Sequence, residues 1–276
     1  MPRAPEPDPP GIPELPPGLI GEASPRAGVA YRLLRLAWHV PAALLGFRVE
    51  VTGLESLPRD RRGPLTGGYI AAGLPHRSWV DPFLAWGWLP VEPRLVFFGD
   101  ARTMARSPLR RWVMRRVGGI LPIPSHGGPR SFATHLAAAA DVLDAGAVFC
   151  LFPESGLPSP AGIARPISPG FAYMALRSGA PIAPIVLGGN DVLCLGRRLT
   201  LRIGAPVGWR ELAAMDGAPV PDVAPEPGSG AERRLARRVS EGFHAFTADA
   251  VLRAHEDMVP PPGTRLRWTG LTHLFR

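Results

Sequence analysis

Short apolar runs alternate along this chain with longer segments that have the hydrophobic periodicity of a helix. Of the features of the sequence, this alternation restricts the possible fold classes most. Five of the runs have strand character, at residues 47–58, 67–75, 147–154, 181–189 and 197–207. Residues 131–146 and 170–180 have helical character, each with a glycine at or near its end. The pattern predicts an α/β domain over about residues 29–210. The prolines within 181–189 indicate the end of a strand or a strand at the sheet edge, because proline cannot donate to a ladder.

The two ends of the chain differ from this central region. Nine prolines fall within residues 1–25, where no hydrophobic period is present, so residues 1–27 are predicted to be a disordered proline-rich tail. The folded domain is expected at residues 28–212, and a linker at residues 213–230. Residues 231–276 are predicted to be an amphipathic helix followed by a basic aromatic tail.

The basic charge of the chain suggests an anionic partner. Net charge is +8, and all 31 basic side chains are arginine, which implies affinity for nucleic acid, an anionic membrane surface or phosphorylated substrates. Residues 28–47 and 102–116 are predicted helices in which arginine, tryptophan and bulky apolar residues are interleaved. Each fits an interfacial helix; the alternatives are a helix packed on the core for the first and a solvated basic face for the second. No recognised nucleic-acid-binding module is present, so nucleic acid is not expected as a partner.

The cysteines and the N-terminus bear on the compartment. Cys150 and Cys194 lie inside apolar runs, which predicts buried, reduced side chains. The proline-rich start lacks the apolar core of a secretory signal, and no apolar run reaches the roughly 18–20 residues of a spanning helix. We therefore expect a cytoplasmic protein that is peripheral to the cytoplasmic membrane.

Polar side chains follow two of the predicted strands, where ligands usually bind in α/β sheets. His76 and Asp81 come after the strand at 67–75, and Glu154 ends the strand at 147–154. Positions five apart on a regular helix differ by about 140°, so the His–Asp pair must lie on a turn or a helix start. Ser78, between them, is predicted to cap the following helix. No metal-ligand cluster, P-loop or dinucleotide fingerprint accompanies the pair, and no metal or other cofactor is expected.

Four sequence blocks occur in an order that resembles the glycerolipid acyltransferase family, typified by lysophosphatidic acid acyltransferases. The blocks are "VTGLESLP", "HRSWVDP", "FPES" and "GAPIAPIVL", and together they span roughly residues 48–207. The resemblance implies a mixed, mostly parallel sheet flanked by helices, and it makes residues 28–212 the acyltransferase domain. It also implies transfer of a fatty acyl group from acyl-CoA or acyl-ACP, as co-substrate, to a lipid hydroxyl, with 1-acylglycerol-3-phosphate as one candidate acceptor.

The resemblance gives roles to the residues of the second and third blocks. His76 would be the general base that removes the acceptor's hydroxyl proton, and Asp81 would orient the imidazole and stabilise the imidazolium. Glu154, Ser155 and Gly156 would line the substrate site. Glu154 would either bind the acceptor's hydroxyl or hold the site together by pairing with an arginine.

The chain departs from the family pattern where the acceptor is bound. Pro124 stands where the family has an arginine implicated in acceptor binding, and Pro75 replaces an asparagine that commonly precedes the histidine. Arg130 (or His126) and Arg165 are the nearest candidates to replace the missing cations. Because the catalytic pair is intact while the acceptor residues are altered, an alternative is a catalytically degenerate member that acts as a membrane-surface lipid-binding protein.

Overall fold

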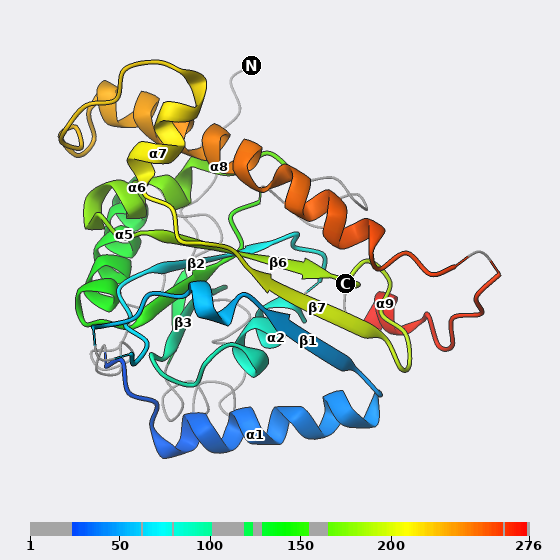
Figure 1. The fold of residues 1–276 in the computed structure, drawn as a ribbon. Coiled ribbons are helices and arrows are strands. Elements are labelled where there is room, and N and C mark those ends of the chain that lie inside the picture. The colour runs from blue at the N-terminus through cyan, green and yellow to red at the C-terminus, as the bar shows by residue number, and fades with distance from the viewer. Residues whose placement is uncertain are drawn as a thin grey trace, which may run out of the picture.

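In the computed structural model, the strands of the described residues form one sheet, in which their order in space differs from their order along the chain (Figure 1). The structure describes residues 24–61, 63–78, 80–100, 119–123, 129–154, 165–261 and 263–274. Residues 1–23 of the predicted tail and the helix predicted over 102–116 lie outside the described residues.

Seven strands of the described ranges make up the sheet: β1 (Arg48–Thr52), β2 (Ile70–Leu74), β3 (Leu95–Asp100), β4 (Ile120–Ile123), β5 (Val148–Leu151), β6 (Ile182–Gly188) and β7 (Arg198–Ile203). The labelled α-helices of the described ranges are α1 (Val29–Leu44), α2 (Asp81–Trp88), α5 (Pro129–Asp144), α6 (Pro169–Ser178), α7 (Trp209–Ala213), α8 (Gly230–Glu256) and α9 (Leu271–Leu274). Short 3-10 turns cover Leu54–Ser56 and Ala214–Asp216.

The strands lie in the order β1-β7-β6-β2-β5-β3-β4. Every pairing between them is parallel except that of β6 with β7, which is antiparallel. The α/β class and the mixed, mostly parallel sheet are therefore confirmed.

Of the two explanations offered for the prolines, a strand end holds for Pro181, which directly precedes β6, whereas a sheet edge is wrong because β6 lies between β7 and β2. Pro184 sits inside the strand, opposite Ala72 of β2. Its carbonyl accepts a hydrogen bond from the Gly204 N–H (2.9 Å), so its nitrogen faces the same side, toward β7. On β6, the ladder with β7 covers Ile185–Gly188, so Pro184 lies just outside it and its missing N–H costs no hydrogen bond of that ladder.

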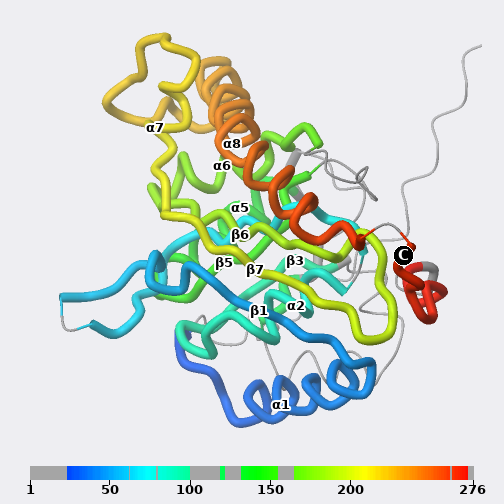
Figure 2. Tube along the Cα trace, turned by 45° about the vertical axis from the view of Figure 1, so that its right-hand side comes forward, coloured from blue at the N-terminus to red at the C-terminus, as the bar shows by residue number. Residues whose placement is uncertain are grey.

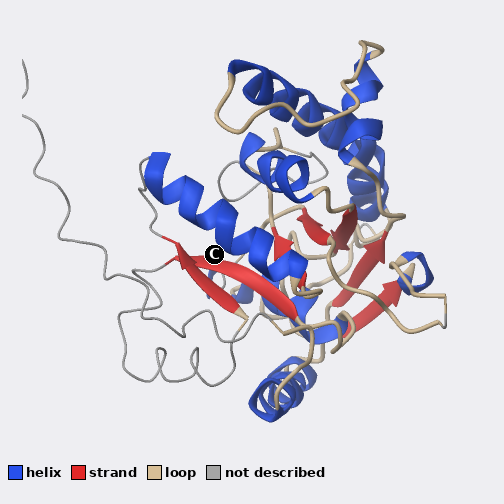
Figure 3. Cartoon of the chain, turned by 90° about the vertical axis from the view of Figure 1, so that its left-hand side faces the viewer, coloured by secondary structure: helices blue, strands red, loops and turns tan. Residues whose placement is uncertain are grey.

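Side chains of β2 alternate between two apolar layers on opposite faces of the sheet. Ile70, Ala72 and Leu74 join the core beneath α5, α6 and α8. Ala71 joins the core beneath α1 and α2. All five residues of β2 are buried, as expected for a central strand covered on both faces. Figure 3 shows the strands as a layer with helices on either side.

The helix predicted at the start of 231–276 is α8, and its N-cap is Ser229, whose hydroxyl accepts the Glu232 N–H (3.0 Å). Leu235, Val239 and Phe243 of this helix are buried in the core that also contains α6. Its C-terminal part lies alongside β6, close to the carboxyl end of that strand (Figure 2). The boundary of 28–212 for the domain and the tail at 231–276 stay predictions, but α8 itself contributes to the core.

Helix α1 packs on α2 through aromatic rings and leaves an apolar face outside. Tyr31 contacts Trp86 edge-on (5.6 Å between centroids), and Trp38 contacts Phe83 (5.2 Å). The outer face carries five exposed apolar side chains at helical spacing: Val29, Leu33, Leu36, Val40 and Leu44. The helix therefore has both features weighed from the sequence, a packed face and a free apolar face.

Candidate active site

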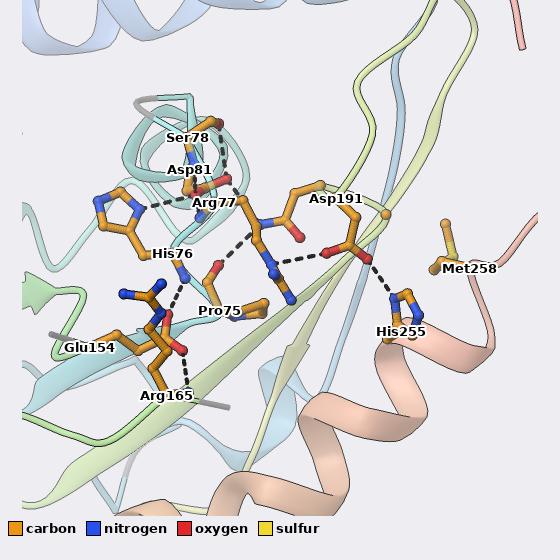
Figure 4. Close-up of polar contacts among 12 residues, drawn as sticks. Pro75, His76, Arg77, Ser78, Asp81, Glu154, Arg165, Asp191, His255 and Met258 are labelled. Carbon is orange, nitrogen blue, oxygen red and sulfur yellow. Dashed lines mark hydrogen bonds and ion pairs between the residues drawn. The ribbon is translucent and has the colours of Figure 1, made fainter. Parts of the chain in front are cut away.

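The candidate site lies at the carboxyl ends of three adjacent strands. β2 pairs in parallel with both β5 and β6, so the segments that follow these strands meet at one edge of the sheet. They bring together His76 after β2, Glu154 after β5 and Asn190 after β6, as Figure 4 shows.

His76 and Asp81 form a hydrogen-bonded pair, with 3.0 Å between His76 Nδ1 and Asp81 Oδ2. His76 lies in the loop after β2, and Asp81 is the first residue of α2, so the pair occupies a helix start as predicted. The Asp81 side chain is fully buried, whereas 19% of the His76 side chain is exposed. A carboxylate can only accept, so Nδ1 carries the proton and Nε2 is left as the basic nitrogen. No described residue hydrogen-bonds Nε2.

Several donors converge on the buried Asp81 carboxylate. Oδ2 also accepts the backbone N–H groups of Arg77 (2.6 Å) and Ser78 (2.8 Å). Oδ1 accepts from Asn190 Nδ2 (3.0 Å) and the Ser78 hydroxyl (3.4 Å). Each donor stabilises the negative charge and restrains the carboxylate that orients His76.

The predicted capping role of Ser78 is wrong. The N-cap of α2 is Val80 and not Ser78, and the Val80 side chain makes no capping hydrogen bond. The Ser78 hydroxyl instead accepts the Val80 N–H (3.3 Å) and contacts Asp81, because the turn ahead of the helix is organised around the Asp81 carboxylate.

Glu154 connects the His76 loop to the segment that ends at α6. One carboxylate oxygen accepts the His76 N–H in a short hydrogen bond, and the other accepts the Arg165 N–H (3.1 Å). The side chain is buried at 8% exposure. Both hydrogen bonds are to the main chain, so Glu154 holds the backbone of the general-base candidate in place. Binding of an acceptor hydroxyl by Glu154 stays a prediction.

Behind the pair, Arg77 is a buried cation that sequence analysis missed. Its Nε lies 2.9 Å from Asp191 Oδ1, and its side chain is 5% exposed. Burial lowers the pKa of the Arg77 guanidinium, while the carboxylates of Asp191, Glu154 and Asp81 act in the opposite direction. Asp191 Oδ2 also accepts from His255 Nδ1 (2.6 Å), which ties the end of α8 to the site. Figure 4 shows Asp191 and His76 on opposite sides of Asp81.

The remaining predicted substrate-binding residues are only partly described. Arg165 lies beside Glu154, and its charge lowers the pKa of Arg77, so this cation is close to the site. Arg130 lies in the first turn of α5, but its side chain lies outside the described residues, as do Ser155 and Gly156. Their roles stay predictions. Within the described ranges no group of three or more His, Cys, Asp or Glu could hold a metal ion.

Comparison with known proteins agrees with this geometry. The family model described as Acyltransferase matches residues 48–188, just over half of the chain. The fold is similar to the crystal structure of the 1-acyl-sn-glycerophosphate (LPA) acyltransferase PlsC from Thermotoga maritima, with a TM-score of 0.53 and 19% sequence identity. That match covers 84% of this chain and 81% of the Thermotoga chain. A comparison with curated proteins gave no match.

Proposed function

The chain belongs to the acyltransferase family, and on this basis we propose that it transfers a fatty acyl group from a thioester to a lipid hydroxyl, with His76 as the general base. The observation that carries the proposal is the His76–Asp81 pair, in which Asp81 holds Nδ1 and leaves Nε2 as the base. The similar Thermotoga protein is a 1-acyl-sn-glycerophosphate acyltransferase, which makes that lysolipid the first acceptor to test.

The reaction requires one proton to move twice. His76 Nε2 removes the proton from the acceptor hydroxyl as its oxygen attacks the thioester carbonyl carbon. The imidazolium that forms is stabilised by the Asp81 carboxylate at 3.0 Å. When the C–S bond breaks, the departing thiolate takes the proton from the imidazolium, and the products are a lipid ester and a free thiol. The acceptor's own hydroxyl is the nucleophile, so no serine or cysteine nucleophile is needed.

We further propose that α1 rests on an anionic membrane surface where the lipid acceptor is reached. Its outer stripe of Val29, Leu33, Leu36, Val40 and Leu44 is exposed, an apolar area typical of interfacial helices. Two of its arginines turn toward the domain: Arg32 pairs with Glu92, and Arg35 donates to the Leu89 carbonyl. These contacts fix the helix so that the stripe faces outward. None of the helices in the described ranges combines the length and apolar content that crossing a membrane requires.

The decisive experiment measures free thiol release and product mass. The purified protein is incubated with acyl-CoA or acyl-ACP and a panel of lysolipids that includes 1-acylglycerol-3-phosphate. We expect thiol release to depend on the acceptor, and His76→Ala and Asp81→Asn to lower turnover by about 10²- to 10⁴-fold while the fold is retained. Near wild-type turnover in His76→Ala would contradict the mechanism. Vesicle binding without acceptor-dependent thiol release would favour the degenerate lipid-binding alternative.

A further inference from the structure

Asn190 is the only asparagine in the 276 residues, and the chain contains no glutamine. This single carboxamide side chain lies against the catalytic pair. We propose that Asn190 is a positioning residue, which holds the Asp81 carboxylate and the start of the His76 loop in the geometry that acyl transfer needs. The inference rests on the proposed function, because it assigns a role in the same reaction.

The contacts of Asn190 use both hydrogens of its amide nitrogen. Nδ2 lies 3.0 Å from Asp81 Oδ1 and 3.1 Å from the Pro75 carbonyl oxygen, and the residue is 2% exposed. One bond therefore holds the residue that precedes His76, and the other holds the carboxylate that orients its ring. The two tethers lie on either side of His76 in the sequence but start from one nitrogen atom.

The backbone that presents Asn190 is itself restrained. Gly189 has a φ of +83°, a left-handed conformation that turns the chain after β6, and an added Cβ would lie 2.5 Å from the Arg198 carbonyl oxygen. The Gly189 carbonyl accepts from Arg197 Nε (2.9 Å), and the next residue, Asp191, pairs with Arg77. Asn190 is thus held from both sides, as a residue that positions another must be.

A carboxamide suits this position better than the other polar side chains. A hydroxyl has one hydrogen to donate and could serve only one of the two oxygens. An aspartate would place a second carboxylate against Asp81, and an arginine or lysine would add a competing positive charge next to the pair. The neutral amide supplies two donors and adds no charge, so the Asp81 carboxylate remains available to stabilise the positive charge that forms on the His76 imidazole.

The test compares three substitutions of Asn190 with a matched control. Asn190→Ala removes both donors, Asn190→Asp keeps the size but replaces the donors by a carboxylate, and Asn190→Ser keeps one donor. Thr247→Ala is the control, because Thr247 is equally buried and its hydroxyl bonds the Phe243 carbonyl (2.8 Å) inside α8. Folding is followed by circular dichroism and thermal melting, and turnover is measured only on folded protein.

We expect kcat of Asn190→Ala to fall by about 10- to 100-fold, with KM for both substrates changed by less than about 3-fold, because misplacement of a catalytic group acts on the transition state. The kcat of Asn190→Ser should lie between those of the wild type and Asn190→Ala, and the kcat of Asn190→Asp should be lower than that of Asn190→Ala. In the wild type, the His76 Nδ1 proton should give a downfield proton resonance that is lost in Asn190→Ala, while Thr247→Ala keeps both the resonance and kcat.

Wild-type kcat in folded Asn190→Ala would overturn the inference, as would equal losses in Asn190→Ala and Thr247→Ala. If Asn190→Asp fails to fold, the comparison of kcat between Asn190→Ser and Asn190→Ala decides. A higher kcat in Asn190→Ser supports the proposal, and equal kcat values in these two variants overturn it. An inactive His76→Ala together with a fully active Asn190→Ala refutes only this inference. An active His76→Ala refutes the proposed function itself.

Discussion

The ring of Phe152 stacks on the imidazole of His76, with 4.5 Å between the ring centroids and 29° between the planes. Phe152 comes from the segment after β5, and His76 from the segment after β2. Asp81 restrains the imidazole through Nδ1, and Phe152 restrains one of its faces. Gly73 of β2 leaves the space that the Phe152 ring occupies, because a Cβ on Gly73 would lie 2.4 Å from Phe152 Cε1.

Gly73→Ala is therefore expected to displace Phe152 from His76. Overpacking of this kind lowers the free energy of unfolding by about 1–3 kcal/mol, and we expect kcat to fall as well because the imidazole loses its stacking partner. Urea unfolding gives the first quantity, and turnover at a temperature where the variant is fully folded gives the second.

A double-mutant cycle tests whether Phe152 is the cause. Phe152→Leu in the wild type should lower stability and kcat, but in the Gly73→Ala background it should lower stability less, because the smaller side chain relieves the clash. Strictly additive effects on stability would show that the methyl group of Gly73→Ala acts on some other neighbour.

Glu154→Gln separates the two roles considered for this residue. Each Glu154 oxygen accepts a backbone N–H, from His76 and from Arg165. Glutamine turns one of these acceptors into an NH₂ group that faces a donor, which leaves a buried N–H unpaired at about 1–3 kcal/mol. We expect lower stability by urea unfolding and a lower kcat with little change in the acceptor KM.

The opposite result would indicate acceptor binding. If Glu154 bound the acceptor hydroxyl, Glu154→Gln would raise the acceptor KM and leave the free energy of unfolding nearly unchanged. Measuring both quantities on one preparation of the variant keeps the two roles distinguishable.

Much of the fold could be predicted because buried central strands carry a strong local pattern. β2, β5, β6 and β7 all lie within predicted runs. α5 and α6 match the predicted helices to within two residues at each end, and α8 is the predicted C-terminal helix. β4 could not be predicted because it has only four residues and contains Pro122, which argues against a strand unless the strand is known to lie at the sheet edge. The central place of β6 could not be inferred, since the side that the Pro184 nitrogen faces depends on its pairing with β7.

The His76–Asp81 pair could be predicted because the two residues lie only five positions apart, between the end of β2 and the start of α2. Asn190 could not, because it is 109 residues from Asp81 and reaches it only through the strand order that places β6 beside β2. One signal was available: a polar Asn-Asp pair directly after a predicted strand, in a chain with a single asparagine. Arg77 lies inside the "HRSWVDP" block, but its role depends on Asp191, which is similarly distant in the sequence.

Acid should remove the contribution of Glu232 to stability. Glu232 is 1% exposed and accepts from Arg177 Nε (2.8 Å) and Nη2 (3.2 Å). Burial raises the pKa of Glu232, but the hydrogen bonds from Arg177 and the Gly228 N–H outweigh it and hold this pKa below its usual value. Because its pKa is lower in the folded state, Glu232 contributes its full stabilisation at pH values above its unfolded pKa of about 4.3. This stabilisation is lost as the pH falls through the folded-state pKa.

Glu232→Gln should consequently lower the free energy of unfolding by about 1–3 kcal/mol at pH 7, and the difference from the wild type should shrink below about pH 4. Urea unfolding at pH 7, 5 and 3.5 measures this. Glu50→Gln is the control, because both side chains of the Glu50–Arg198 pair are more than half exposed, so this substitution should change the free energy of unfolding little at any of the three pH values. A Glu232→Gln difference that is independent of pH would contradict the assignment.

Leu36→Asp tests whether the outer stripe of α1 contacts the membrane. Leu36 is 66% exposed and lies in the middle of the stripe, so its substitution should leave the fold unchanged. Burial of one leucine side chain contributes about 1.5–3 kcal/mol, and a carboxylate would also be repelled by anionic lipid. For Leu36→Asp we expect at least about a 10-fold fall in partitioning to phosphatidylglycerol-containing vesicles, measured by co-sedimentation.

Val223→Asp is the matched control, since Val223 is 76% exposed and belongs to the segment between α7 and α8. Figure 1 shows α7 at the opposite end of the molecule from α1. Equal loss of binding in both variants would show that added negative charge, and not the α1 stripe, decides membrane affinity. Loss in Leu36→Asp alone, with full activity on a lysolipid below its critical micelle concentration, would place α1 at the membrane and separate its role from the chemistry at His76.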